Sequence, residues 1–280
     1  MSIKLIAVDL DGTLLNSRTE ISRVNQEALA EAAARGIEIV VITGRRYHSA
    51  RPFVSLIPCL VTLISSNGAR IGTSSGQVLH RDFLPRAVAR QVLEVALAHR
   101  PYTVLIFDVE GRGQLVMHCE ASEQSPLAWY RKNSLDCLLQ VSDLAVALVE
   151  DPIQVLFGGP PERMEPIEPL IRASPAARSV HLSWTKYLTR HVSLLDCMNR
   201  GCTKGRALAL WAERRGISAN EVMAIGDNYN DCEMLEFAGH PFLMGNCCEG
   251  LANPRWRTTL SADEDGVAAA IREHVLNRES

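Results

Sequence analysis

The stretch Ile6-Ala7-Val8-Asp9-Leu10-Asp11-Gly12-Thr13-Leu14 decides the fold of this chain. Its opening residues form a short apolar run, which is typical of a strand buried on both faces of a sheet. The run stops in two carboxylates, a glycine and a hydroxyl. Charged side chains in such a place either close the strand in a turn or hold a ligand, and the stretch alone leaves both interpretations open.

The spacing of Asp9 and Asp11 favours a reactive pair. Side chains alternate along a strand, so both carboxylates start on the same side, and a glycine at position 12 lets the backbone approach a ligand closely. Two ionised carboxylates this close repel one another unless they share a cation or hold a proton. Because one or two carboxylates and phosphate oxygens are the usual ligands of Mg²⁺, the pair predicts Mg²⁺ at Asp9.

The composition excludes several classes of protein. A chain of 280 residues with 47% hydrophobic and 22% charged residues is typical of a globular protein with one large domain or two ordinary ones. The net charge of −3 and scattered basic residues argue against nucleic-acid binding. The sequence shows no signal peptide and no apolar run of the roughly 18 residues that a membrane span needs. We therefore expect a cytoplasmic protein without nucleic-acid or membrane partners.

Cysteine and histidine spacing argues against a zinc site. The sequence contains eight cysteines and eight histidines. None of them forms a Cys-x-x-Cys or a His-x-x-x-His pair. In a cytoplasmic chain the cysteines are expected to be reduced and mostly buried.

The amino-terminal third predicts a parallel α/β sheet. Ser22 precedes a helical pattern that ends at Gly36, and the run 37–42, apolar apart from Glu38, follows. Strand, helix and strand form a βαβ unit, whose strands should lie parallel in a sheet covered on both faces. A weaker helix at 48–55, a third buried strand at 61–64 and a hairpin of short strands at 70–71 and 77–80 come next.

The pattern changes between about Leu84 and Tyr187. Longer, antiparallel-looking strands alternate there with helices, which predicts a separate α+β domain inserted into the first. We therefore expect a catalytic core domain at 1–83 and 188–280 and an inserted domain at 84–187. The insert should contain helices at 86–98, 126–132 and 161–171 and strands at 103–107, 114–119, 153–157 and 179–184.

The buried strands and helices of the core resume after the insert. Thr203 is expected to cap a helix at 204–214, and a strand at 222–225 ends in Gly226-Asp227. A helix from Asp231, an apolar segment at 242–244 and a last helix at 266–276 complete the chain. The expected fold class is α/β, a Rossmann-like doubly wound parallel sheet with an inserted α+β domain.

Three predicted strands end in polar residues that should meet. Asp9 follows the first strand, Thr43 the second, and Asp227 the strand near the carboxyl end. Ligands of open parallel sheets bind at the carboxyl ends of the strands. We therefore expect Asp227 to be a second metal carboxylate and Asn230 to face the ligand.

Lys204 occupies an unusual place for a lysine. It lies in the first turn of a predicted helix, where the helix dipole disfavours a cation. A solvated surface lysine is one interpretation. A phosphate bound there with help from the helix amides is the other, and Thr43 and the Gly44 amide can donate to the same oxygens.

These segments resemble the motifs of the haloacid dehalogenase superfamily of phosphatases. The similarity covers the whole chain, and the order of the motifs around the insert resembles the Cof-like branch with a C2-type cap domain. The segments that carry it are Asp9-Leu10-Asp11-Gly12-Thr13-Leu14, Thr43-Gly44-Arg45, Asn67-Gly68, Thr203-Lys204-Gly205 and Gly226-Asp227-x-x-Asn230-Asp231.

The resemblance implies a role for each motif residue. Asp9 would take the phosphoryl group as an aspartyl phosphate, and Asp11 would protonate the leaving oxygen and then activate water. The implied ligands of Mg²⁺ are Asp9, the Asp11 backbone carbonyl and Asp227. Phosphate would be held by Thr43, Gly44, Lys204 and Asn230, with Thr13 and Asp231 in support.

The predicted function is Mg²⁺-dependent hydrolysis of a small phosphomonoester. We expect a sugar phosphate or a phosphorylated cofactor precursor, such as a flavin or pyridoxal phosphate, and a monomer or homodimer. A sugar phosphomutase and a non-enzymatic protein that binds a phosphorylated metabolite are the alternatives. The inserted domain should set specificity. Candidate contacts there are Trp129, Tyr130, Trp184 and Arg190, for each of which a core or surface role is as good an interpretation.

Overall fold

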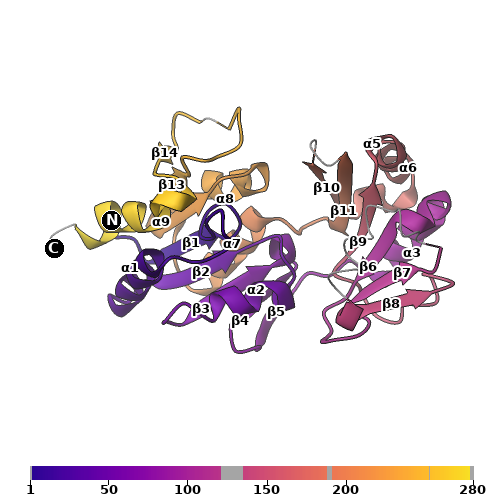
Figure 1. Cartoon of the computed structure of the whole chain (residues 1–280), viewed down its shortest axis with the longest axis horizontal. Helices are drawn as coiled ribbons and strands as arrows, with labels where there is room; N and C mark the ends of the chain where they lie inside the picture. Colours follow the sequence, from indigo (N-terminus) through magenta and orange to yellow (C-terminus); the bar gives the residue numbers. More distant parts are fainter. Residues whose placement is uncertain (1, 121–134, 188–190, 252, 278–280) are drawn as a thin grey trace. The chain divides into compact units, whose positions relative to one another are not determined.

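The computed structural model describes residues 2–120, 135–187, 191–251 and 253–277 (Figure 1). The chain divides into two compact units, one formed by Met1–Arg81 with Thr203–Ser280 and the other by Asp82–Cys202. The second boundary lies after residue 202, whereas the sequence placed it after 187. The reason is a strand, β11 (Val192–Asn199), which pairs with two strands of the second unit and so belongs to it.

The first unit is built on an eight-stranded sheet with the order β14-β13-β12-β1-β2-β3-β4-β5. The pairs from β14 to β3 are parallel, as expected, and a hairpin of β4 and β5 adds two antiparallel strands at one edge. The strands are β1 (Leu5–Asp9), β2 (Glu38–Ile42), β3 (Val61–Ser65), β4 (Arg70–Thr73), β5 (Val78–Arg81), β12 (Val222–Gly226), β13 (His240–Leu243) and β14 (Arg257–Thr258).

Helices cover both faces of this sheet, which confirms the doubly wound α/β class. Ile6 and Val8 of β1 belong to a core that includes α1, α2 and α9, while Leu5 and Ala7 belong to a core with α7 and α8. Side chains that alternate along one buried strand therefore pack into two different cores. The helices are α1 (Arg23–Ala34), α2 (Tyr47–Val54), α7 (Lys204–Arg214), α8 (Cys232–Phe237) and α9 (Gly266–Ile271).

The two predicted amino-terminal helix caps are present. The Ser22 hydroxyl accepts from the amide of Asn25 at 3.1 Å, and the Thr203 hydroxyl accepts from the amide of Arg206 at 3.2 Å. Each bond satisfies a backbone donor that has no partner within its own helix. The cap at Thr203 fixes Lys204 as the first residue of α7.

The second unit contains a six-stranded sheet with the order β10-β11-β9-β6-β7-β8. Its pairs are antiparallel except for β7 with β8. Alternate residues of its strands, among them Leu105, Val155 and Leu195, pack with helix residues in a separate core. The remaining elements are α3 (Arg86–Val95), β6 (Thr103–Ile106), β7 (Leu115–His118), β8 (Leu138–Val141), β9 (Gln154–Gly159), α5 (Pro161–Met164), α6 (Ile167–Arg172) and β10 (Val180–Tyr187).

The elements of the second unit depart from the sequence-based expectation in three places. Strands β8 and β11 were not expected. The helix expected at 161–171 is split, because Pro166 lacks the amide that an uninterrupted helix needs. The helix expected at 126–132 lies outside the described residues. In neither unit is any described helix long and apolar enough to cross a membrane.

Candidate active site

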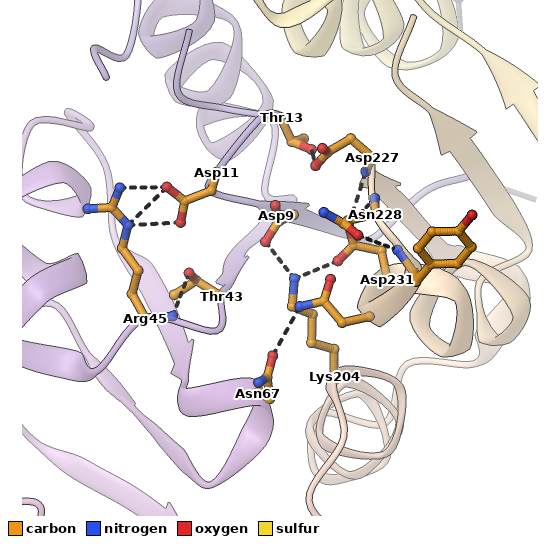
Figure 2. A network of polar contacts seen from close by, with 12 residues as sticks. Asp9, Asp11, Thr13, Thr43, Arg45, Asn67, Lys204, Asp227, Asn228 and Asp231 are labelled. Atoms are coloured by element: carbon orange, nitrogen blue, oxygen red, sulfur yellow. Dashed lines mark hydrogen bonds and ion pairs between the residues drawn. The ribbon is translucent and has the colours of Figure 1, made fainter. Parts of the chain in front are cut away.

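Four buried ionisable side chains meet at the carboxyl ends of β1 and β12 (Figure 2). Asp9 is the last residue of β1, Asp227 follows β12, and Lys204 opens α7. The Lys204 ammonium donates to Asp9 Oδ1 at 2.7 Å and to Asp231 Oδ1 at 2.6 Å. Lys204 is 2% exposed, so the lysine is a buried partner of carboxylates and not a solvated surface residue.

The parallel pairing of β1 with β12 creates this meeting. Val8 lies opposite Ile225, which brings the residues after both strands to the same edge of the sheet. Thr13 Oγ1 donates to Asp227 Oδ1 at 2.8 Å. Asp231 Oδ2 accepts from the backbone amides of residues 227 and 228, both at 3.0 Å, and thereby shapes the turn that carries Asp227.

Burial governs the protonation of the cluster. It raises the pKa of Asp9 well above the usual range; Asp231 and Asp227 add to the rise, and Lys204 opposes it. Burial and the charge of Asp231 raise the pKa of Asp227 to about 6, against the hydrogen bond from Thr13. Burial by itself lowers the pKa of Lys204, but Asp231 and Asp9 outweigh it and leave that pKa raised. The single positive charge of Lys204 therefore does not balance the three carboxylates of the cluster.

The donor set fits a magnesium ion. Oxygen atoms of Asp9, Asp227 and Asp231 all lie within 4.8 Å of one another, and all three residues are buried. Carboxylate oxygens are the ligands that this hard cation prefers. The backbone also leaves room beside them, because a Cβ atom added to Gly12 would lie 2.5 Å from Asp227 Oδ2. Gly12 has a φ of +77°, a conformation that favours glycine.

Asp11 lies apart from this cluster. Strand β1 ends at Asp9, so the alternation expected for the pair does not extend to Asp11. The Arg45 guanidinium donates to both oxygens of its carboxylate, with Nε at 2.8 Å from Oδ2 and Nη2 at 2.5 Å from Oδ1. Figure 2 shows the carboxylate directed toward Arg45 and away from Lys204. The hydrogen bond with Asp11 raises the pKa of Arg45, and the guanidinium lies over the ring of Phe53 at 4.8 Å.

The expected phosphate-binding segments lie around the cluster. Thr43 is fully buried, and its hydroxyl accepts from the Arg45 amide at 3.0 Å. A Cβ added to Gly44 would lie 3.2 Å from Asn67 Oδ1. The side-chain amide of Asn230 donates to that same oxygen at 3.2 Å. Asn67 thus contacts two segments that were predicted from the sequence to bind phosphate.

Two residues at the site received no role from the sequence. Arg45 and Asn67 both lie within motif segments, so their positions carried a signal. Their partners are 34 and 163 residues away in the chain, and such distant pairs are not readable from spacing. Of the cap-domain candidates, Trp184 packs against the core of the second unit and donates to Glu168. Trp129, Tyr130 and Arg190 lie outside the described residues.

Comparison with known proteins identifies the family. The model of haloacid dehalogenase-like hydrolases matches residues 6–271. The chain is 30% identical to phosphatase YwpJ of Bacillus subtilis, over 98% of this chain and all of the relative. It is 26% identical to 5-amino-6-(5-phospho-D-ribitylamino)uracil phosphatase YitU of Bacillus subtilis, over 96% of this chain and 97% of the relative.

A solved structure supports the same assignment. A haloacid dehalogenase-like hydrolase from Bacteroides thetaiotaomicron superposes with a TM-score of 0.79 at 27% identity, covering 97% of this chain and 99% of that one. The family match spans both sequence segments of the first unit and the whole of the second. The chain therefore belongs to the haloacid dehalogenase-like hydrolase family and is an enzyme of its Cof-like phosphatase branch.

Proposed function

We propose that this enzyme hydrolyses a small phosphomonoester with the help of Mg²⁺ by transferring the phosphoryl group to Asp9. One observation carries the proposal: the buried Lys204 ammonium donates to the carboxylates of both Asp9 and Asp231, and the Asp227 carboxylate lies beside them. An anionic phosphoryl group must approach the Asp9 carboxylate, which is itself negatively charged. Positive charge fixed beside it makes that approach favourable.

Asp9 attacks the phosphorus atom and forms an aspartyl phosphate as the leaving oxygen departs. The bond from Lys204 to Asp9 Oδ1 restrains the rotation of the attacking carboxylate. When bound by Asp9, the Asp11 carbonyl and Asp227, Mg²⁺ would supply further charge to the phosphoryl oxygens. Asp231 and Thr13 hold Lys204 and Asp227 in place through the hydrogen bonds described above.

Asp11 performs the proton transfers. It gives a proton to the leaving oxygen in the first step. In the second step it takes a proton from the water that attacks phosphorus, while the bond between phosphorus and Asp9 breaks and inorganic phosphate leaves. Its carboxylate is bonded to the Arg45 guanidinium. Asp11 must therefore exchange its bond to Arg45 for a bond to the leaving group. Arg45 is thus involved when the substrate binds.

The phosphoryl oxygens are held by groups from three segments. Thr43 and the Gly44 amide donate from the segment after β2, Lys204 from α7, and Asn230 from the turn after β12. All four belong to the segments that lie around Asp9. Donors placed in advance stabilise the charge that spreads over these oxygens in the transition state.

The substrate is proposed to be a sugar phosphate or a phosphorylated cofactor precursor. A relative acts on 5-amino-6-(5-phospho-D-ribitylamino)uracil, which combines a phosphorylated sugar-like chain with a heterocycle. Flavin mononucleotide and pyridoxal phosphate share this combination of a heterocycle and a phosphate ester. The second unit, proposed as the cap domain, would select among such leaving groups. A cytoplasmic location and a monomer or homodimer belong to the same proposal.

Phosphate release tests the proposal. The wild type and Asp9→Asn are assayed on sugar phosphates, nucleotides, flavin mononucleotide and pyridoxal phosphate, with Mg²⁺ and with EDTA. Release that needs Mg²⁺ and is lost in Asp9→Asn is the expected result, and Asp136→Asn, on the second unit, should behave as wild type. Full release by Asp9→Asn would contradict the mechanism. An isomerised product without free phosphate would make the enzyme a phosphomutase.

A further inference from the structure

The turn after β3 holds its backbone in an uncommon conformation. Ser66 has a φ of +51° and Asn67 a φ of +54°, and Gly68 follows with a φ of +110°. A residue other than glycine with such a φ costs about 1 kcal/mol or more. Two such residues in succession persist only when their surroundings fix them.

Hydrogen bonds from the turn to the segment after β2 provide this restraint. The Ser66 amide donates to the Arg45 carbonyl at 2.8 Å, and the Asn67 amide donates to the Thr43 carbonyl at 3.0 Å. Gly68 lies against α7, since a Cβ added there would be 2.7 Å from the Thr203 carbonyl oxygen. The turn therefore contacts the two segments that carry Thr43 and Lys204.

The Asn67 side chain adds a third contact. Its Oδ1 accepts from Asn230 Nδ2 at 3.2 Å and would lie 3.2 Å from a Cβ added to Gly44. Figure 2 shows Asn67 reaching toward the group around Lys204 from below. All of the segments proposed to bind the phosphoryl oxygens thus touch this one turn.

We propose that Asn67 is a positioning residue for phosphoryl transfer, which acts by fixing the amide of Asn230. A side-chain amide has two N–H donors and one carbonyl acceptor. With one donor bound to Asn67 Oδ1, the second is fixed in direction and can be given to a phosphoryl oxygen. Without that bond the Asn230 amide can rotate by half a turn and present its carbonyl oxygen, which repels the phosphoryl group.

A second role for Asn67 must be separated from this one. Asparagine adopts positive φ more readily than most residues, so it could be present only to form the turn. Glycine adopts the same angles without strain but has no acceptor oxygen. Asn67→Gly therefore keeps the turn and removes the contact with Asn230, which distinguishes the two roles.

The experiment compares wild type, Asn67→Gly, Asn230→Ala and the double variant. Thr19→Gly is the matched control, because Thr19 also has a positive φ, of +62°, and lies in an exposed turn between β1 and α1. Measured quantities are kcat, KM, the inhibition constant of orthovanadate, which resembles the phosphoryl group in transfer, and the melting temperature.

The expected result is selective for catalysis. Asn67→Gly should melt no lower than wild type but lose about tenfold to a hundredfold in kcat, with a smaller change in KM. Vanadate inhibition should weaken by a similar factor, and the double variant should be no worse than the weaker single variant. Thr19→Gly should match wild type in every measurement.

Two outcomes would overturn the inference. Wild-type kcat in Asn67→Gly would show that the residue only forms the turn. Losses that multiply in the double variant would show that Asn67 does not act through Asn230. The inference rests on the proposed phosphatase function, and the two failures are distinguishable: if the wild type itself releases no phosphate from any substrate, the function fails and not the role of Asn67.

Discussion

The two units differ in the surroundings of their buried carboxyl groups. In the first unit Asp9, Lys204, Asp227 and Asp231 lie together at one edge of the sheet and are each at most 7% exposed. In the second unit the partly buried Asp196 accepts from Gln154, and burial raises its pKa to about 6. A single carboxyl of this kind can become neutral by holding one proton, whereas three carboxyls beside one lysine exceed the positive charge that the lysine supplies. Removal of charges from water is costly, so such a cluster points to ligand binding and not to stability.

The largest expected effect comes from Lys204→Met. The variant leaves Asp9 and Asp231 without their partner, and an uncompensated buried charge costs about 3–5 kcal/mol of unfolding free energy. Loss of kcat by about 10² to 10³ should accompany it, because the charge beside the phosphoryl group is lost. Urea unfolding and phosphate release measure the two effects.

Lys4→Met is the matched control for Lys204. Lys4 also pairs with a carboxylate, Glu221, at 2.7 Å, but its side chain is 55% exposed. Exposed pairs of this kind contribute about 0–1 kcal/mol. If Lys204→Met lowered the free energy of unfolding no more than Lys4→Met, the expected difference between a buried and a surface ion pair would be contradicted.

The next effect is expected from Gly12→Ala. The new Cβ would lie 2.5 Å from Asp227 Oδ2 and so displace a proposed Mg²⁺ ligand. The Mg²⁺ concentration for half-maximal activity should rise about tenfold to a hundredfold. Gly36→Ala is the control, because Gly36 has a similar φ of +83° but nothing within 4 Å of an added Cβ. An equal effect of both variants on Mg²⁺ affinity would refute a steric cause.

The smallest effect concerns the second unit and its dependence on pH. The pKa of Asp196 is about 6 in the folded protein and lower in the unfolded chain. Between those values the folded form holds a proton that the unfolded form lacks, so its stability falls as pH rises through about 4 to 6. The free energy of unfolding of Asp196→Asn should therefore exceed that of wild type by about 1–2 kcal/mol above pH 6 and equal it below pH 4. A difference between Asp196→Asn and wild type that does not depend on pH would contradict this.

Much of the first unit was predictable because its central strands are nearly continuous apolar runs. Residues 37–42 are mostly β-branched, and the strand observed there is Glu38–Ile42. Polar residues after such runs located Asp9, Thr43 and Asp227 at one edge. Asp231 was expected only to support the site, because an aspartate that caps a helix and one that joins a carboxylate cluster have the same sequence pattern.

The second unit was less readable because its sheet is antiparallel and partly polar. Strand β11 contains Ser193 and Asp196 among its apolar residues, and so lacked the uniform pattern that marked the strands of the first unit. Its pairing with β9 and β10 is a tertiary property that no local pattern encodes. The pair of Asp11 with Arg45 likewise depends on the fold.

The covalent role of Asp9 is tested by measuring phosphorylation of Asp9 in the variant Asp11→Asn. An aryl phosphate, whose leaving oxygen needs no proton, can still transfer its phosphoryl group to Asp9, but the variant cannot activate water to remove it. We expect a burst of one phenolate per enzyme, with one phosphoryl group on the peptide that contains Asp9. Steady turnover without a burst, and with no phosphoryl group on that peptide, would contradict it.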